Sequence, residues 1–100
     1  MKLDKLDQKT MQIIEFLLEN PVMDYSKTEI AELSGISRST LYRRWDTLEE
    51  LGILEKTRKY QNTQLYSLNT DSEIVNLLGR LQEDLVNVEQ ESQEKIAAVA

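Results

Sequence analysis

The chain contains no cysteine and no histidine among its 100 residues. Without cysteine it has no disulfide and no thiol nucleophile, and nothing in it requires an oxidising compartment. Without histidine it also lacks the other common zinc ligand and the commonest general base. Carboxylates are plentiful, but none occurs with a glycine-rich loop, metal-ligand spacing or a nucleophile triad. We therefore expect no metal site, no cofactor and no catalytic residue, so the protein should not be an enzyme.

Long apolar runs are absent as well. No run approaches the roughly 18 residues that a membrane-spanning helix needs, and the N-terminal residues lack the apolar centre of a signal peptide. With 40% apolar and 30% charged residues, the composition is that of a soluble globular protein. A length of 100 residues without internal repeats fits one domain with an appended helix. We expect a cytoplasmic protein with no membrane partner.

Residues 26–51 predict a short helix, a turn at Gly35 and a longer helix. Ser26 and Glu29 have the spacing of a capping box, so the short helix should begin at Ser26. Glycine tolerates the positive φ angle that often ends a helix, which places the turn at Gly35. The apolar side of the short helix is expected to consist of Ile30, Ala31 and Leu33.

The longer helix should begin at Ser37, whose side chain can cap it. Apolar residues at spacings of four, three and three predict its buried face: Leu41, Trp45, Leu48 and Leu51. Polar residues lie beside that face: Arg38, Ser39, Tyr42, Arg43 and Asp46, with Arg44 at the border. Two adjacent helices separated by a glycine turn are typical of the helix-turn-helix motif, whose second helix enters the major groove of DNA.

A further helix should precede this motif. It is expected to begin at Asp4 or Asp7 and to end at Asn20, because the residue before a proline avoids helical angles and Pro21 cannot donate a hydrogen bond. Its core-facing stripe is Leu6, Thr10, Ile13, Ile14, Leu17 and Leu18. We interpret this helix as scaffold, with a share in dimerisation as the alternative. The loop of residues 21–25 carries no chemical signal.

A β-hairpin should follow the motif. After Gly52, two runs rich in β-branched and aromatic residues are separated by an asparagine-containing turn. Tyr66 and Leu68 should help to cover the core, whereas Leu65 should point the other way. The tip, residues 58–63, is polar and cationic.

From Ile30 to Leu68 the chain resembles the winged helix-turn-helix transcription regulators of bacteria and archaea, the MarR/ArsR-like superfamily. Their motif is matched by Ile30, Ala31, Gly35, Ser37, Ser39, Thr40, Leu41, Arg43, Trp45, Leu48, Gly52 and Ile53. The resemblance implies a mainly α fold with a small β-hairpin, in which the hairpin is the wing. Together with its C-terminal tail, the chain is similar to small archaeal winged-helix DNA-binding proteins with a C-terminal coiled-coil helix.

That tail should form one long helix. Thr70 and Glu73 have capping-box spacing, and the helix is expected to run to about Ala98, roughly 40 Å at 1.5 Å per residue. Apolar residues at spacings of four, three, four and three form the seam of a coiled coil: Ile74, Leu78, Leu81, Leu85 and Val88. The expected partner is a second copy of the chain, in a parallel or an antiparallel pairing; the alternative is that the helix folds back on the first helix.

The chain is therefore expected to have two parts. Residues 1–69 should form a winged helix-turn-helix DNA-binding domain, and residues 70–100 a C-terminal dimerisation helix. The resulting homodimer should bind double-stranded DNA and regulate transcription, with the second helix of the motif in the major groove and the wing on phosphates or in the minor groove.

The expected DNA-binding residues lie on that second helix and on the hairpin. Arg43 is the best candidate for contacting a guanine edge, and Tyr42 for a thymine methyl group or a phosphate. No carboxylate is placed to pair with Arg44 within its helix, so a phosphate contact suits it. The complete set is Arg38, Ser39, Thr40, Tyr42, Arg43, Arg44, Lys56, Arg58, Lys59, Gln61 and Asn62. For the hairpin cations, the alternative is that they only protect an exposed strand edge.

The net charge of −6 opposes this interpretation, because DNA-binding domains usually carry a basic excess. The distribution of the charge along the chain weakens this objection. Residues 1–25 carry three basic and five acidic residues (−2), residues 26–66 seven and six (+1), and residues 67–100 two and seven (−5), which together give −6. The acidic residues therefore gather in the tail, and the cations gather where DNA would lie.

An acidic winged helix is also compatible with a protein-protein interaction module of a transcription or replication complex. Tyr42, Tyr60 and Leu65 would be the anchors of such a surface. Replacing Arg43 separates the two hypotheses, because it should abolish binding to DNA while leaving the fold intact in either case.

Overall fold

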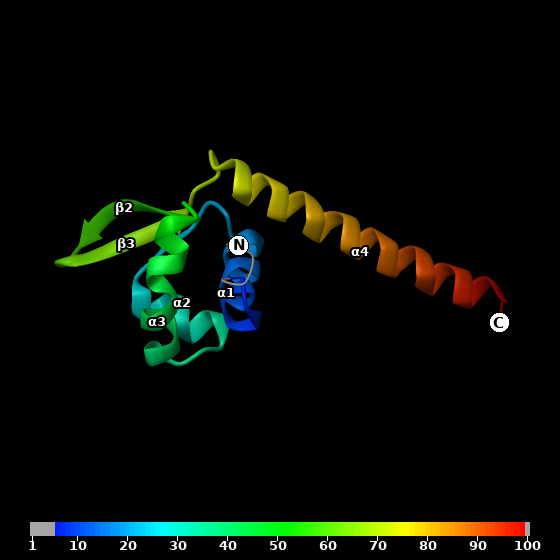
Figure 1. Ribbon diagram of the computed structural model, residues 1–100, viewed down its shortest axis with the longest axis horizontal. Helices are drawn as coiled ribbons and strands as arrows, with labels where there is room; N and C mark the ends of the chain where they lie inside the picture. The colour runs from blue at the N-terminus through cyan, green and yellow to red at the C-terminus, as the bar shows by residue number, and fades with distance from the viewer. Residues whose placement is uncertain (1–5, 100) are drawn as a thin grey trace.

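The computed structural model describes residues 6–99, and the side chains of residues 6–90. Figure 1 shows a small helical domain with a β-hairpin on one side and a long helix that projects away on the other. The elements in chain order are α1 (Gln8–Glu19), β1 (Asp24–Tyr25), α2 (Lys27–Ser34), α3 (Arg38–Glu50), β2 (Leu54–Tyr60), β3 (Thr63–Leu68) and α4 (Glu73–Val99). The expected mainly α fold with a small hairpin is confirmed. Within residues 6–99, no helix is long and apolar enough to cross a membrane.

Helix α1 begins directly after Asp7, which caps it. The backbone N–H of Thr10 donates to Oδ1 of Asp7 at 2.9 Å, and the helix stops at Asn20, just before Pro21. The alternative start at Asp4 lies outside the described residues. One face of α1 is fully buried in the core. Side chains from α2, α3, the sheet, the residue before β2 and the first turn of α4 complete this core. Its apolar members are Ile13, Ile14, Leu17, Tyr25, Ile30, Ala31, Leu41, Trp45, Leu48, Ile53, Tyr66, Leu68 and Val75.

Helices α2 and α3 form the helix-turn-helix. Ser26 and Glu29 make the expected capping box, and Gly35 ends α2 with φ at 77°, a left-handed conformation that favours glycine. The expectation that Leu33 is buried is wrong, because its side chain is 57% exposed. Ser34 takes that place in the core, and its hydroxyl donates to the carbonyl of Ile30 at 2.5 Å, so the buried oxygen is satisfied.

The sheet has three antiparallel strands in the order β1-β3-β2. The hairpin turn consists of Gln61 and Asn62, both with positive φ (49° and 66°), as a two-residue type I′ turn requires. The sequence did not indicate strand β1, a two-residue strand that pairs Tyr25 with Tyr66. Through β1 the loop after α1 is attached to β3, which orients the hairpin against the helices.

Helix α4 begins at Glu73, and its cap differs from the expected one. Ser72, not Thr70, caps the helix: the N–H of Val75 donates to Oγ of Ser72 at 3.3 Å. The side chain of Asn69 accepts the N–H of Asp71, so residues 69–71 form a turn and the helix starts later.

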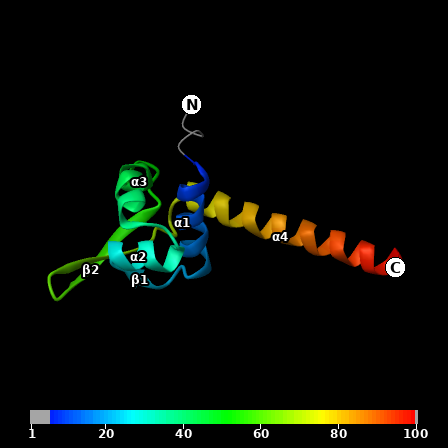
Figure 2. The same cartoon turned by 90° about the horizontal axis from the view of Figure 1, so that it is seen from below.

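Only the first turns of α4 lie against the domain, and the rest extends away from it, as Figure 2 also shows. Val75 is buried, and Leu78 packs against the core of its own domain. Gly79 also lies close to α1: a methyl group there would lie 3.6 Å from Leu18. The alternative in which α4 folds back on α1 therefore holds only for this first part.

Candidate DNA-binding surface

Helix α3 is held in the domain by its apolar face, which leaves its polar face in solvent. Leu41, Trp45 and Leu48 are buried as expected. The indole N–H of Trp45 donates to Glu49 at 2.8 Å, and its ring meets Tyr66 of β3 edge-on, with centroids 4.7 Å apart. These contacts fix the rotation of α3 about its axis, and therefore which side chains it presents.

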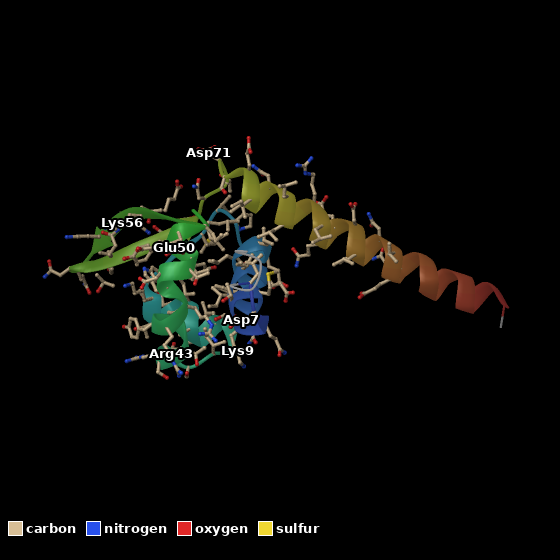
Figure 3. The ribbon with its side chains drawn as sticks, viewed as in Figure 1. Asp7, Lys9, Arg43, Glu50, Lys56 and Asp71 are labelled. Atoms are coloured by element: carbon tan, nitrogen blue, oxygen red, sulfur yellow. The ribbon has the colours of Figure 1, made fainter. Side chains whose placement is uncertain are left out.

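The N-terminal half of α3 presents four of the expected DNA-binding residues: Arg38, Ser39, Tyr42 and Arg43. All four are exposed, Tyr42 by 56%. Arg43 lies at the end of the domain away from α4 (Figure 3). Among the described residues, its side chain makes one long hydrogen bond of 3.4 Å, from Nε to the carbonyl of Ser39. Its guanidinium therefore keeps most of its donors free.

Thr40 is placed differently from these residues. Its hydroxyl accepts a hydrogen bond from Ser37 at 2.8 Å, and its backbone N–H donates to the same Ser37 oxygen at 3.1 Å. The side chain is half-buried and belongs to the helix cap. Thr40 therefore contributes mainly to the cap of α3, and its hydroxyl is already hydrogen-bonded to Ser37.

Arg44 has a carboxylate partner that the sequence analysis did not foresee. Its Nη2 lies 2.7 Å from Oδ2 of Asp7, the residue that caps α1. The pKa of Asp7 is lowered, mainly by the hydrogen bonds from Thr10 and further by Arg44. The prediction for Arg44 considered only partners within its helix, whereas Asp7 lies 37 positions earlier in the chain. Arg44 thus ties the start of α1 to α3.

The wing carries the remaining expected residues: Lys56, Arg58, Lys59, Gln61 and Asn62. All five are exposed, and Figure 3 shows Lys56 on the hairpin, which projects from the domain. Arg58, however, forms an ion pair with Asp24 of β1, with Nε 3.0 Å from Oδ2. Thr57 donates to the same carboxylate oxygen at 2.8 Å. The guanidinium of Arg58, followed by Thr57, lowers the pKa of Asp24, so this carboxylate is charged at neutral pH.

An open groove of about 460 Å³ lies between the helix-turn-helix and the wing. It is lined by Ser26, Lys27, Thr28, Tyr42, Thr63, Gln64 and Tyr66. The Nζ atom of Lys27 lies 4.5 Å from the ring centroid of Trp45, 5.7 Å from that of Tyr42 and 6.0 Å from that of Tyr66. Lys27 could not be singled out from the sequence, because its aromatic neighbours come from two other elements and no local spacing reveals them.

Two helices joined by a glycine turn, with the second helix exposed and an antiparallel hairpin beside it, define a winged helix-turn-helix protein. Residues 8–58 match the model of the IclR helix-turn-helix domain, and the chain belongs to this family. The family is one of DNA-binding transcription regulators. The resemblance to winged helix-turn-helix regulators is therefore confirmed.

Solved structures of other proteins share this fold. ZitR of Lactococcus lactis, as its C30AH42A mutant in apo form, is 18% identical with a TM-score of 0.68, over 93% of this chain and 73% of its own. Sso10a-2, a DNA-binding protein from Sulfolobus solfataricus, is 16% identical with a TM-score of 0.57, over 91% and 95%. HlyU from Vibrio cholerae is 28% identical with a TM-score of 0.56, over 79% and 85%. No curated protein matches the sequence.

Proposed function

We propose that the protein regulates transcription by binding specific sites on double-stranded DNA as a homodimer. In this proposal α3 enters the major groove and the wing contacts phosphates or the minor groove. The observation that carries the proposal is the exposed N-terminal half of α3, where Arg38, Tyr42 and Arg43 project from a helix whose other face is buried. A helix fixed in this way presents its side chains to base edges in one register.

Arg43 is the residue that we assign to base recognition. A guanidinium with free donors can bind both the O6 and N7 atoms of guanine, the commonest specific contact in the major groove. Arg38 and Ser39 lie one turn earlier, at the exposed start of α3, where phosphates or neighbouring bases would be reached. Tyr42 suits a thymine methyl group or a phosphate.

The wing supplies the charged contacts in this proposal. Lys56 and Lys59 are exposed and have no acidic partner among the described residues, so they are available to phosphates. Gln61 and Asn62 form the exposed tip, which would contact the minor groove. Arg58 would have to exchange Asp24 for a phosphate, so we rank it below the two lysines.

The exposed apolar stripe of α4 supports dimerisation through this helix. This stripe differs from the expected seam at one position, because Leu78 packs against its own domain and Leu77 is exposed in its place. The stripe consists of Ile74, Leu77, Leu81, Leu85 and Val88. A helix whose apolar stripe is exposed in the single chain is stabilised by pairing with its own copy. Residues 1–69 then act as the DNA-binding part and residues 70–100 as the dimerisation part.

A selection of duplexes from a random DNA library tests this function. The wild type, Arg43→Ala and the control Arg80→Ala would be compared at near-physiological salt; Arg80 is exposed on α4, away from the proposed surface. We expect wild type and Arg80→Ala to enrich the same inverted repeat, because a two-fold dimer reads two half-sites about one helical turn, or a multiple of it, apart. Arg43→Ala should lose the enrichment.

An absence of enrichment by a folded wild-type dimer would contradict the proposal. The exposed rings of Tyr42 and Tyr60 would then favour the alternative, a module that docks onto another protein of a transcription or replication complex. Aromatic residues are enriched in such interfaces, whereas lysine is depleted.

A further inference from the structure

The groove beside Lys27 differs in charge from the rest of this acidic chain. The whole protein carries a net charge of −6, yet the seven residues that line the groove include no carboxylate and one ammonium group. The other lining groups are hydroxyls, an amide and two aromatic rings. A hollow with this composition is suited to an anion and unsuited to a cation.

The ammonium group of Lys27 is held in place by aromatic rings. It lies over the face of Trp45 at 4.5 Å from the centroid, within the distance at which a cation is attracted to a ring. Trp45 is itself fixed by its hydrogen bond to Glu49 and its edge-on contact with Tyr66. No carboxylate pairs with Lys27 within the described part of the chain, so its charge is not neutralised.

The hydroxyls around the groove complete a donor set. Thr28 lies on the same wall as Lys27, at the start of α2, and Thr63 lies on the opposite wall, at the start of β3. Burial raises the pKa of Tyr66, with Glu49 adding to the shift, so its hydroxyl stays protonated and can donate. Tyr42 belongs both to this groove and to the exposed face of α3.

We propose that this groove binds one phosphodiester group of the DNA strand that passes between α3 and the wing, with Lys27 as its anchor. The proposal rests on the proposed function, because it assigns one more contact to the same DNA. A strand that α3 contacts on one side and the wing on the other has to cross the space between them, where the groove lies. A phosphate seated there fixes the register of the protein on the duplex and carries no base preference.

The test uses Lys27→Gln, with Arg80→Gln as a control that removes the same charge from α4. Binding of the 100-residue chain to its selected duplex and to a scrambled duplex would be measured by fluorescence anisotropy at several salt concentrations. Losing one phosphate contact should lower the slope of log K against log salt by about 0.9 for each bound subunit. Extrapolated from ~1 M salt, binding at ~0.15 M should be about fivefold weaker for each bound subunit, or about 30-fold weaker for a dimer. The ratio of the two affinities should stay unchanged, and Lys27→Arg should recover most of the loss.

A second variant guards against a folding defect. Thr28→Glu places an acid in the first turn of α2, where it favours the helix but repels a phosphate in the groove, so binding should weaken while the fold is kept. Trp45 is the only tryptophan, so its emission reports on the ring beneath Lys27 and should change when wild type binds DNA. Wild-type affinity and slope in both variants would overturn the phosphate site. Failure of the wild type to bind any duplex would overturn the proposed function.

Discussion

Leu81 lies at the centre of the exposed stripe on α4, and shortening it tests the proposed dimer directly. Its side chain is 54% exposed in the single chain. Burying a whole leucine side chain stabilises by about 1.5–3 kcal/mol, so covering the exposed half is worth about 1 kcal/mol per subunit. Each dimer contains two copies, so Leu81→Ala should weaken association by about 2 kcal/mol, or about 30-fold in the dissociation constant.

Val86 offers a matched control on the same helix. Its side chain is 46% exposed, but it lies on another side of α4, beside a hollow that Glu19 of α1 also lines. Val86→Ala should therefore leave the dissociation constant almost unchanged. Sedimentation equilibrium over a wide concentration range would measure all three proteins. Equal effects of the two substitutions, or a wild type that stays monomeric at every concentration, would refute pairing through this stripe.

Two further predictions concern stability. Asp24 and Asp7 have folded-state pKa values below the ordinary 3.8, so the stability that these carboxylates contribute is present at neutral pH and is lost as pH falls below about 4. In urea denaturation at a series of pH values, Asp24→Asn should make the free energy of unfolding fall less steeply on the acid side, and an unchanged dependence would contradict this. Gly35→Ala should lower the free energy of unfolding by about 1–2 kcal/mol, since φ is 77° and the added methyl lies 3.3 Å from Gln12. Thermal melting would measure the change, and an unchanged melting temperature would contradict the prediction.

The helices and the hairpin could be predicted from the sequence because their signals are local. The capping box at Ser26, the glycine at position 35 and the leucine spacing of α3 each involve residues within one or two turns. The error at Leu33 has a different origin. On a helix of eight residues, the buried face is decided by what packs against it, and here Gln12 of α1 donates to the carbonyl of Ser34 at 2.6 Å.

The exposure of the candidate residues was predictable from the sequence, but their partners were not. The exposed positions on α3 follow from helical periodicity, and Arg38 and Arg43 are exposed as predicted. The ion pairs of Arg44 and Arg58 join residues 37 and 34 positions apart, and only the tertiary fold brings those residues together. Strand β1, which supplies Asp24, has two residues and therefore too little pattern to recognise.

These partners change how the charge of the protein should be understood. Arg44 and Arg58 are committed to Asp7 and Asp24, so they help to hold α1, α3 and the wing in one arrangement. Five cations on the proposed surface have no acidic partner within the described residues: Lys27, Arg38, Arg43, Lys56 and Lys59. With Arg43 assigned to a base edge, the other four cations are available for phosphates, which corresponds to a salt slope of about 3.6 per subunit, a strong electrostatic contribution despite the net charge of −6. Residues 67–100 carry a net charge of −5, and their acidic residues lie beyond the wing. This charge repels DNA from α4, so the cationic surface is the favourable place for DNA to bind.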